Sequence, residues 1–359
     1  MKVKFMFSSS EGNIELDKDV LNLPFKLSLT KQHKWMRLKD YFELICSFVQ
    51  DRFCLDNLNE LYIISEKHGS CYNVASAWLI SPEKIQKYAI LVAIGDKGDS
   101  LAQEYFLLNK LGQIRKSSNK YLPRCYYLEQ KRINGETVHL AILEWFDRYY
   151  EWHILENGNI SVWDTEEGYY TLKKSLQPCV YQKCAYILTY LFDPFSLSQV
   201  YPWHHSAGDF VLKVYKDDVD VKLTTVRSYA PVLKLDMPRE VSIVISLVYF
   251  FLNMSIKMRL DKKDGIKKVL LAPENVVIPV LKGFTLALQE LVSEGHLKQN
   301  QREQILNVLY SLNKDELKKL FYSMLNFYTQ EDPLDLPVIL ANTENHINSL
   351  YYSLKAHLQ

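Results

Sequence analysis

The stretch Tyr201-Pro-Trp-His-His-Ser-Ala-Gly-Asp-Phe-Val-Leu-Lys213 decides the fold and carries the candidate chemistry. Two adjacent histidines and an aspartate, Asp209, stand immediately before an apolar run at 210–214. A second apolar run at 221–226 follows across an acidic turn. Two apolar runs joined by a polar turn are typical of a β-hairpin. We therefore expect a rigid strand pair with polar groups held at its mouth, which is a suitable place for a catalytic loop.

Upstream of this stretch the signals favour strands. Apolar runs bounded by turn residues predict strands, and Asn134-Gly135 and Asn157-Gly158 are typical of tight hairpin turns. The expected strands are 3–7, 61–64, 74–80, 88–94, 124–130, 138–145, 152–155 and 160–163. Helices are expected at 39–53 and, after the third strand of the sheet, from about 101 to 111. Residues 58–165 are therefore predicted to form a mainly antiparallel sheet with one inserted helix.

Downstream the pattern is helical. Apolar residues recur at helical spacing, and Asn313 followed by Glu316 is the signature of a capping box. A helix within 270–292 is expected to be interrupted by Pro279 and Gly283. The other expected helices are 176–192, 239–258, 301–312, 314–328 and 344–357. Sheet first and helices later indicate the α+β class.

Composition excludes some partners. The 43 Lys and Arg residues nearly balance the 42 Asp and Glu residues, so no global field points to a nucleic acid or an anionic membrane. Six cysteines without CxxC pairs indicate reduced thiols and a cytoplasmic protein. The start of the chain shows no apolar core of a signal peptide. The most apolar run, 241–256, is shorter than the ~20 residues of a bilayer span, so we expect a helix buried in protein.

The order of elements resembles the protein-kinase-like superfamily, especially its aminoglycoside- and choline-kinase-like branches, over roughly residues 58–300. The resemblance implies an α+β, two-lobed fold with an antiparallel N-lobe and a helical C-lobe. The implied division is an N-terminal extension at 1–57, an N-lobe at 58–150, a C-lobe at 151–300 and a C-terminal helical region at 301–359.

The same resemblance implies a nucleotide site on the N-lobe. Gly69 falls in the hairpin that covers the phosphates, although it is the only glycine there, where the family's loop is Gly-rich. Leu91 takes the place of the family's strand lysine. Glu104 matches its ion-pairing glutamate, and Trp145 and Phe146 follow the strand that leads to the adenine-binding hinge.

Two registers align the opening stretch with the family's catalytic loop. Asp209 can be the catalytic base of a His-Gly-Asp loop, which places the required asparagine at Val214. Alternatively Asp209 replaces the metal-binding asparagine and His204 falls at the base, and the strand after Asp209 favours this register. The second metal ligand has no carboxylate equivalent in 223–231, where Arg227 is available to contact phosphate instead.

Three functions follow as hypotheses. The first is an atypical phosphotransferase using ATP and Mg²⁺, with Asp209 as base or metal ligand and His204 or His205 beside it. The second is a pseudokinase that binds a nucleotide, or a protein partner through its C-terminal helices, without chemistry. The third is a metal-dependent hydrolase, which is disfavoured because adjacent residues on an extended chain point to opposite sides.

Overall fold

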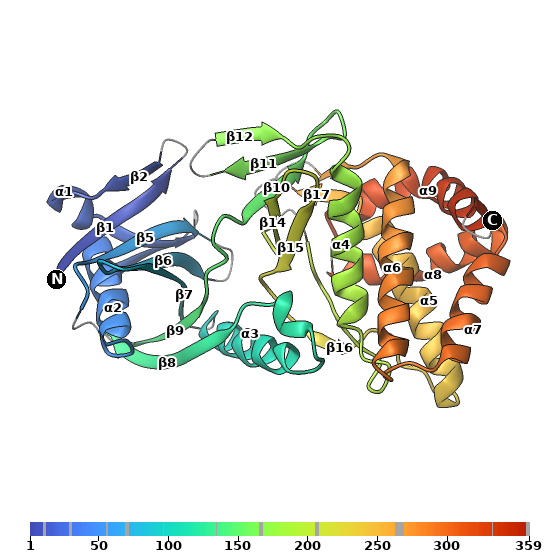
Figure 1. Ribbon diagram of the computed structural model, residues 1–359, viewed down its shortest axis with the longest axis horizontal. Coiled ribbons are helices and arrows are strands. Elements are labelled where there is room, and N and C mark those ends of the chain that lie inside the picture. Colours follow the sequence, from blue (N-terminus) through green and yellow to red (C-terminus); the bar gives the residue numbers. More distant parts are fainter. Residues whose placement is uncertain are drawn as a thin grey trace. The chain divides into compact units, whose positions relative to one another are not determined.

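The chain divides into two compact units in this computed structural model (Figure 1). The first unit is Met1–Arg148 with Asp164–Gly168, and the second is Tyr149–Trp163 with Tyr169–Gln359. The structure describes residues 1–9, 12–28, 31–54, 57–68, 72–95, 97–133, 135–164, 168–204, 208–262, 269–331 and 333–356. The first unit is built on an antiparallel-rich sheet and the second is mainly helical. The predicted α+β class, with an antiparallel-rich sheet first and helices after it, is confirmed.

The sheet of the first unit has seven strands. Their spatial order is β2 (Gly12–Glu15), β1 (Lys2–Ser9), β5 (Glu60–His68), β6 (Asn73–Ile80), β7 (Ile85–Ile94), β9 (Glu136–Glu144) and β8 (Cys125–Ile133). All neighbours are antiparallel except β1 and β5, which run parallel. Lys2–Ser9 of the expected N-terminal extension therefore pairs with a strand of the expected N-lobe. In the sequence, α1 (Lys18–Leu21) and a ribbon of β3 (Pro24–Ser28) and β4 (Lys31–Arg37) come between β2 and the next helix.

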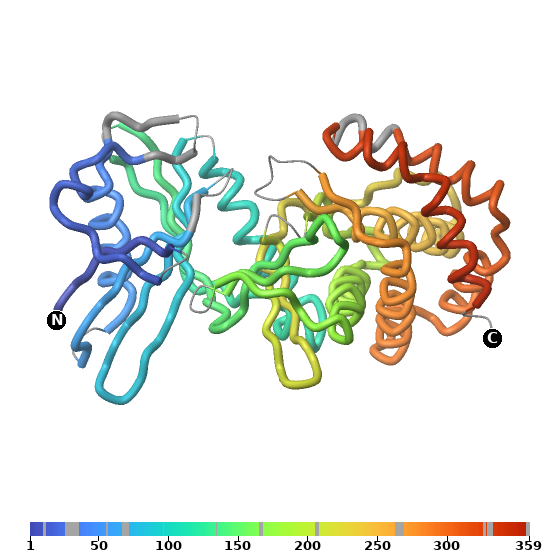
Figure 2. Tube along the Cα trace, turned by 90° about the horizontal axis from the view of Figure 1, so that it is seen from above, coloured from blue at the N-terminus to red at the C-terminus, as the bar shows by residue number. Residues whose placement is uncertain are grey.

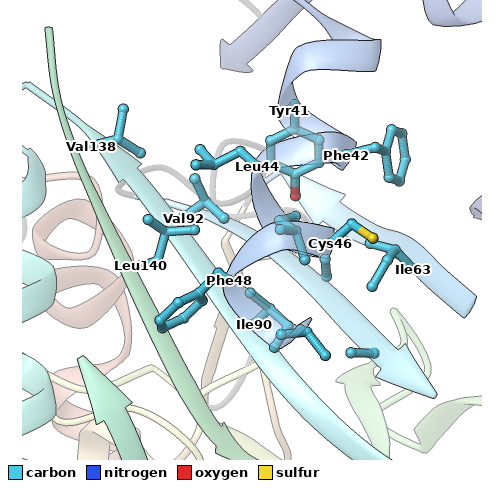
Figure 3. Close-up of a cluster of buried hydrophobic side chains, with 14 of the residues drawn as sticks. Tyr41, Phe42, Leu44, Cys46, Phe48, Ile63, Ile90, Val92, Val138 and Leu140 are labelled. Carbon is cyan, nitrogen blue, oxygen red and sulfur yellow. The ribbon is translucent and has the colours of Figure 1, made fainter. Parts of the chain in front are cut away.

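Helix α2 (Leu38–Gln50) covers one face of this sheet. Its apolar residues recur at helical spacing, so one stripe of the helix is buried. Figure 3 shows Leu44 and Phe48 pointing from α2 toward Val92 and Leu140 of the sheet. Helix α3 (Lys97–Gly112) contacts the opposite face, because a Cβ at Gly98 would lie 1.7 Å from Nδ1 of His139, and neighbouring strand residues point to opposite faces.

The expected sheet of 58–165 proves to be two sheets. The hairpin of β10 (Tyr150–Ile154) and β11 (Ile160–Asp164) pairs with the candidate-site hairpin, which belongs to the second unit. That sheet has the order β12 (Gly168–Thr171), β11, β10, β14 (Phe210–Val214) and β15 (Val219–Leu223). Trp152 of β10 is fully buried, with its ring edge-on to Tyr181 of the following helix at 5.8 Å between centroids. This contact with a later part of the chain is invisible to local periodicity.

The described part of the second unit contains six helices. They are α4 (Gln177–Tyr190), α5 (Arg239–Lys257), α6 (Val277–Ser293), α7 (Gln299–Ser311), α8 (Lys314–Glu331) and α9 (Leu336–Ala356). Two short ribbons join them, β13 (Ser198–Val200) with β16 (Tyr229–Pro231) and β17 (Leu260–Lys262) with β18 (Val269–Leu271). Single-turn 3₁₀ segments within the described residues include Ser118–Lys120, in the first unit, and Glu274–Val276.

The expected interruption of α6 is wrong. Pro279 lies in the first turn of the helix, where the missing N–H costs nothing. Gly283 lies where α6 meets α4, and the two helices run side by side in both views (Figures 1 and 2). A Cβ at this glycine would lie 2.1 Å from the carbonyl oxygen of Gln182. The glycine therefore permits a close helix contact and does not break the helix.

The predicted capping box at α8 is confirmed. Asn313 Oδ1 accepts from the N–H of Glu316 at 3.0 Å, and Glu316 Oε2 accepts from the N–H of Asn313 at 2.8 Å. Each side chain satisfies a backbone donor that the helix leaves without a partner.

Among the residues that the structure describes, two helical segments are long and apolar enough to cross a membrane by length and composition, Arg239–Lys257 and Glu274–Ser293. The first contains the apolar run 241–256 and agrees with the helix expected at 239–258. Of their apolar windows, 67% and 56% are buried inside the protein. Core helices of a folded domain pass the same test, and α5 packs against α6, α7 and α8, so this is weak evidence for a span.

A buried histidine predicts a pH dependence of stability. His346 is fully buried; its Nδ1 lies 3.1 Å from Nη1 of Arg259 and its Nε2 lies 2.9 Å from Oγ of Ser255. Since arginine can only donate, Nδ1 must accept, and the ring is neutral. Burial and the nearby Arg259 charge hold the pKa of His346 well below its usual 6.5. Below about pH 6.5 this histidine therefore binds a proton in the unfolded chain and stays neutral in the folded chain.

We expect the free energy of unfolding to fall by about 1.4 kcal/mol per pH unit below ~6.5 on account of this one ring. Urea unfolding at pH 7.5 and 5.5 measures it, and the decline should be smaller in His346→Gln. The matched control is His296→Gln, at a partly exposed histidine. Equal slopes in wild type and His346→Gln would contradict the assignment.

Candidate functional site

The hairpin expected from the opening stretch is present as β14 and β15, and Asp209 stands directly before it. The ends of the hairpin are tied together. Thr224 donates its backbone N–H to the carbonyl oxygen of Asp209 at 2.7 Å and its hydroxyl to the carbonyl oxygen of Gly208 at 2.7 Å. Gly208 has a φ of 74°, which a side chain would strain. These contacts fix the backbone of Asp209 at the start of β14.

The Asp209 carboxylate is held by three donors. Nη1 of Arg227 lies 2.5 Å from Oδ2 and Nη2 lies 2.6 Å from Oδ1, so the guanidinium binds both oxygens. The backbone N–H of His204 also donates to Oδ2, at 2.7 Å. Asp209 is only 1% exposed, whereas the Arg227 side chain is 34% exposed. A bidentate, charge-assisted pair of this kind is among the strongest polar contacts in proteins.

The two segments that meet at Asp209 are fixed by the β13–β16 ribbon. Val200 pairs with Tyr229, and the N–H of Tyr201 donates to the carbonyl oxygen of Ser228. The ribbon thus aligns the approach to His204 with the residues just after Arg227. Trp203, 2% exposed, packs edge-on to Phe210 at 6.2 Å between centroids and anchors the loop on the hairpin. The Asp209–Arg227 pair is consequently part of a rigid framework.

The structure brings together three of the predicted site residues, Asp209, His204 and Arg227, within the second unit. Glu104 belongs to the first unit, on α3, where it is 4% exposed. Burial, and to a smaller extent the Glu104 charge, raises the pKa of the neighbouring Cys125 thiol to about 12. The roles of Glu104 and Arg227 in nucleotide binding stay predictions.

The other predicted positions carry less information. Trp145 and Phe146 are half-buried and follow β9 in the first unit. Gly69 and His205 lie outside the described residues. Leu91 is 8% exposed on β7, opposite Val74 and Ala141 of the neighbouring strands. An apolar residue therefore occupies the position at which the resemblance requires a lysine.

The role of Asp209 as a metal ligand stays a prediction, and in this structure its carboxylate is engaged by another partner. Both oxygens of Asp209 bind a guanidinium, and Mg²⁺ needs several hard oxygen ligands in octahedral geometry. After β15, where the resemblance places the second metal carboxylate, stands Thr224, whose hydroxyl closes the hairpin. Across the described part of the chain, no group of three or more His, Cys, Asp or Glu residues could hold a metal ion.

Sequence reasoning named Asp209 and Arg227 separately and missed their ion pair. A signal was present, because the two ends of a hairpin must be adjacent. Asp209 precedes β14 and Arg227 follows β15 by four residues, so the hairpin brings together two side chains that are 18 positions apart in the sequence. Opposite charges at the two ends of a predicted hairpin therefore predict an ion pair between them.

Comparisons with known proteins leave the family open. Neither the scan against protein-family models nor the search of curated proteins finds a match. A solved kinase domain from Plasmodium is similar to this chain at 12% identity and a TM-score of 0.31, covering 86% of this chain and 89% of the other. A superposition this loose supports no argument about activity. The kinase-like description therefore rests on the order of strands and helices.

Proposed function

We propose that this chain is a kinase-like protein that does not transfer phosphate, a pseudokinase that acts by binding. The Asp209–Arg227 pair carries the proposal. A phosphotransferase of this fold holds its metal ions with an asparagine of the catalytic loop and an aspartate after the next strand. In the favoured register Asp209 takes the place of that asparagine, and here its carboxylate binds a guanidinium at 2.5 and 2.6 Å.

Energetics supports the same choice. Freeing Asp209 for a metal would break a buried, bidentate ion pair, and breaking such pairs costs about 3–5 kcal/mol. A magnesium ion bound here would have Asp209 as its one protein carboxylate, so its binding would offset little of the cost of breaking the ion pair. We therefore assign the Asp209–Arg227 pair a structural role. The binding surface that we propose for a protein partner is a separate region, the C-terminal helices at 301–359.

Thermal denaturation with ATP tests the proposal. A ligand that binds the folded state at 100 times its Kd raises stability by about 2.7 kcal/mol, which shifts the Tm by several degrees. We expect the Tm in millimolar ATP to be the same with Mg²⁺ as with EDTA, because no metal-dependent complex forms. A rise that requires Mg²⁺ or Mn²⁺ and disappears in Asp209→Asn would contradict the proposal.

An atypical phosphotransferase remains the second candidate, favoured by one observation. A third of the Arg227 side chain is exposed and the adjacent His204 is partly exposed, so a cation and an imidazole are both accessible to a phosphorylated ligand. Transfer from [γ-³²P]ATP distinguishes the two candidates. Incorporation or phosphate release that His204→Gln abolishes supports the phosphotransferase, whereas equal background in wild type and His204→Gln supports the pseudokinase.

A further inference from the structure

The seven-stranded sheet of the first unit ends at β8, which pairs with β9 on one side only (Figure 1). An edge strand presents a row of backbone N–H and C=O groups with which another strand can pair. The neighbouring strand shows which groups these are. The carbonyl oxygen of Thr137 on β9 accepts from the N–H of Gly95, on the β7 side, at 2.9 Å. Because backbone groups alternate in direction along a strand, the even-numbered residues of β9 point toward β8.

The residues of β8 that pair with them are the odd-numbered ones from Tyr127 to Ile133. The backbone groups of Leu128, Gln130 and Arg132 therefore point away from the sheet. Within the part of the chain that the structure describes, these groups make no hydrogen bond to another element, and the Gln130 and Arg132 side chains are exposed. The register irregularity of β8 lies before Tyr127, so the edge from 127 to 133 is regular and open.

The sequence of this edge is complementary to itself. If a second copy pairs antiparallel about a two-fold axis at Gln130, Glu129 stands opposite the second copy's Lys131 on both sides of the axis, and Tyr127 stands opposite its Ile133. These are non-hydrogen-bonded pairs, in which cross-strand side chains lie closest. An axis at Glu129 or at Lys131 would instead place two like charges opposite each other, which is destabilising. Charge therefore selects the register centred on Gln130.

The charged side chains on this face alternate in sign. Glu129 lies 2.6 Å from Nη2 of Arg52 and 3.3 Å from Nζ of Lys131, and Lys131 lies 3.5 Å from Asp51. The Glu129 and Lys131 side chains are 21% and 26% exposed, so both can reach a partner strand. Two acids and two bases leave this set neutral, and two copies approach each other without net repulsion at the edge.

We propose that the chain forms a homodimer through β8, in which the two seven-stranded sheets continue into each other across the Gln130 axis. Three backbone pairs that exchange two hydrogen bonds each give about six hydrogen bonds, and two Glu129–Lys131 pairs fix the register. A single strand edge buries little area, so the dimer is reversible, with a Kd of about 1–100 µM. The proposal is independent of whether the chain transfers phosphate and of the C-terminal surface.

Sedimentation velocity of the full chain from about 1 to about 300 µM brackets this Kd. The mass should rise from 42.1 kDa toward twice that value. Gln130→Pro removes the N–H at the axis, and because this N–H points away from β9 the ladder within the sheet is retained. The variant loses a hydrogen bond in each copy at the centre of the contact, so its dimer should be at least about 10-fold weaker.

Charge reversal tests the register. Glu129→Lys and Lys131→Glu each place like charges opposite each other on both sides of the axis, so each variant alone should associate at least about 10-fold more weakly. In an equimolar mixture the two variants present opposite charges to each other, and a heterodimer should form. The matched control is Glu15→Lys on β2, at the other edge of the same sheet, where the glutamate side chain is 58% exposed. It should dimerise as wild type does.

A wild-type mass that stays at 42.1 kDa over the whole concentration range would overturn the proposal. So would a Gln130→Pro protein that dimerises like wild type, or a mixture of the two charge-reversed variants that stays monomeric. A loss of dimer in Glu15→Lys would place the contact elsewhere and reject β8. Far-UV CD spectra and Tm values equal to those of wild type verify that the variants fold.

Discussion

Replacing Arg227 by alanine should lower the free energy of unfolding by about 3 kcal/mol, the lower end of the range for removing one partner of a buried ion pair. The Asp209 carboxylate, 1% exposed, would lose both guanidinium contacts. Only the backbone N–H of His204 would remain at the carboxylate among the hydrogen bonds described above. Water can enter where the partly exposed arginine stood, which limits the cost. Urea unfolding of wild type and Arg227→Ala measures the difference.

A second substitution isolates the charge. Asp209→Asn in the Arg227→Ala background removes the unpaired negative charge, so it should recover a large part of the lost stability. The control for a surface pair is Asp218→Ala, which breaks the exposed contact with Lys183 and should cost less than about 1 kcal/mol. An Arg227→Ala protein as stable as Asp218→Ala would mean that the Asp209–Arg227 pair has no structural role.

Asp335→Ala should be the most destabilising single change in the second unit, at about 3–5 kcal/mol. Asp335 is fully buried, and its two oxygens lie 2.7 Å from the ammonium groups of Lys257 and Lys262, which are themselves buried. Removing the carboxylate takes this ion-pair partner from two buried lysines, one on α5 and one on β17. Burying charge without its compensating partner is costly.

An exposed ion pair in the same unit provides the comparison. Lys318 and Glu344 form a contact between α8 and α9 with both side chains about half exposed. Glu344→Ala should therefore change the free energy of unfolding by no more than about 1 kcal/mol. If the two variants lose similar stability in urea, burial does not govern these pairs and the argument for the Asp209–Arg227 pair weakens with it.

Local patterns predicted the elements well because their causes are local. The apolar runs around Asp209 predicted the β14–β15 hairpin, the stripe on α2 predicted its buried face, and Asn313 predicted the start of α8. Each depends on residues within a few positions of one another.

What the sequence left open depends on contacts across long separations. The β10–β11 hairpin pairs with β14, about 60 residues later, and nothing in its own periodicity distinguishes one sheet from the other. Helix α9 begins at Leu336, earlier than its amphipathic pattern indicated, and the buried Asp335 stands just before it. The Asp209–Arg227 contact likewise required the arrangement of the chain in space.

Electron paramagnetic resonance of Mn²⁺ in the presence of ATP tests the central claim most directly, because Mn²⁺ takes the same oxygen ligands as Mg²⁺. With Asp209 bound to Arg227, wild-type protein should leave the Mn²⁺–ATP signal unchanged, as should Asp209→Asn. A stoichiometric, protein-dependent change of the signal in wild type that Asp209→Asn abolishes would show the carboxylate on the metal and contradict the account.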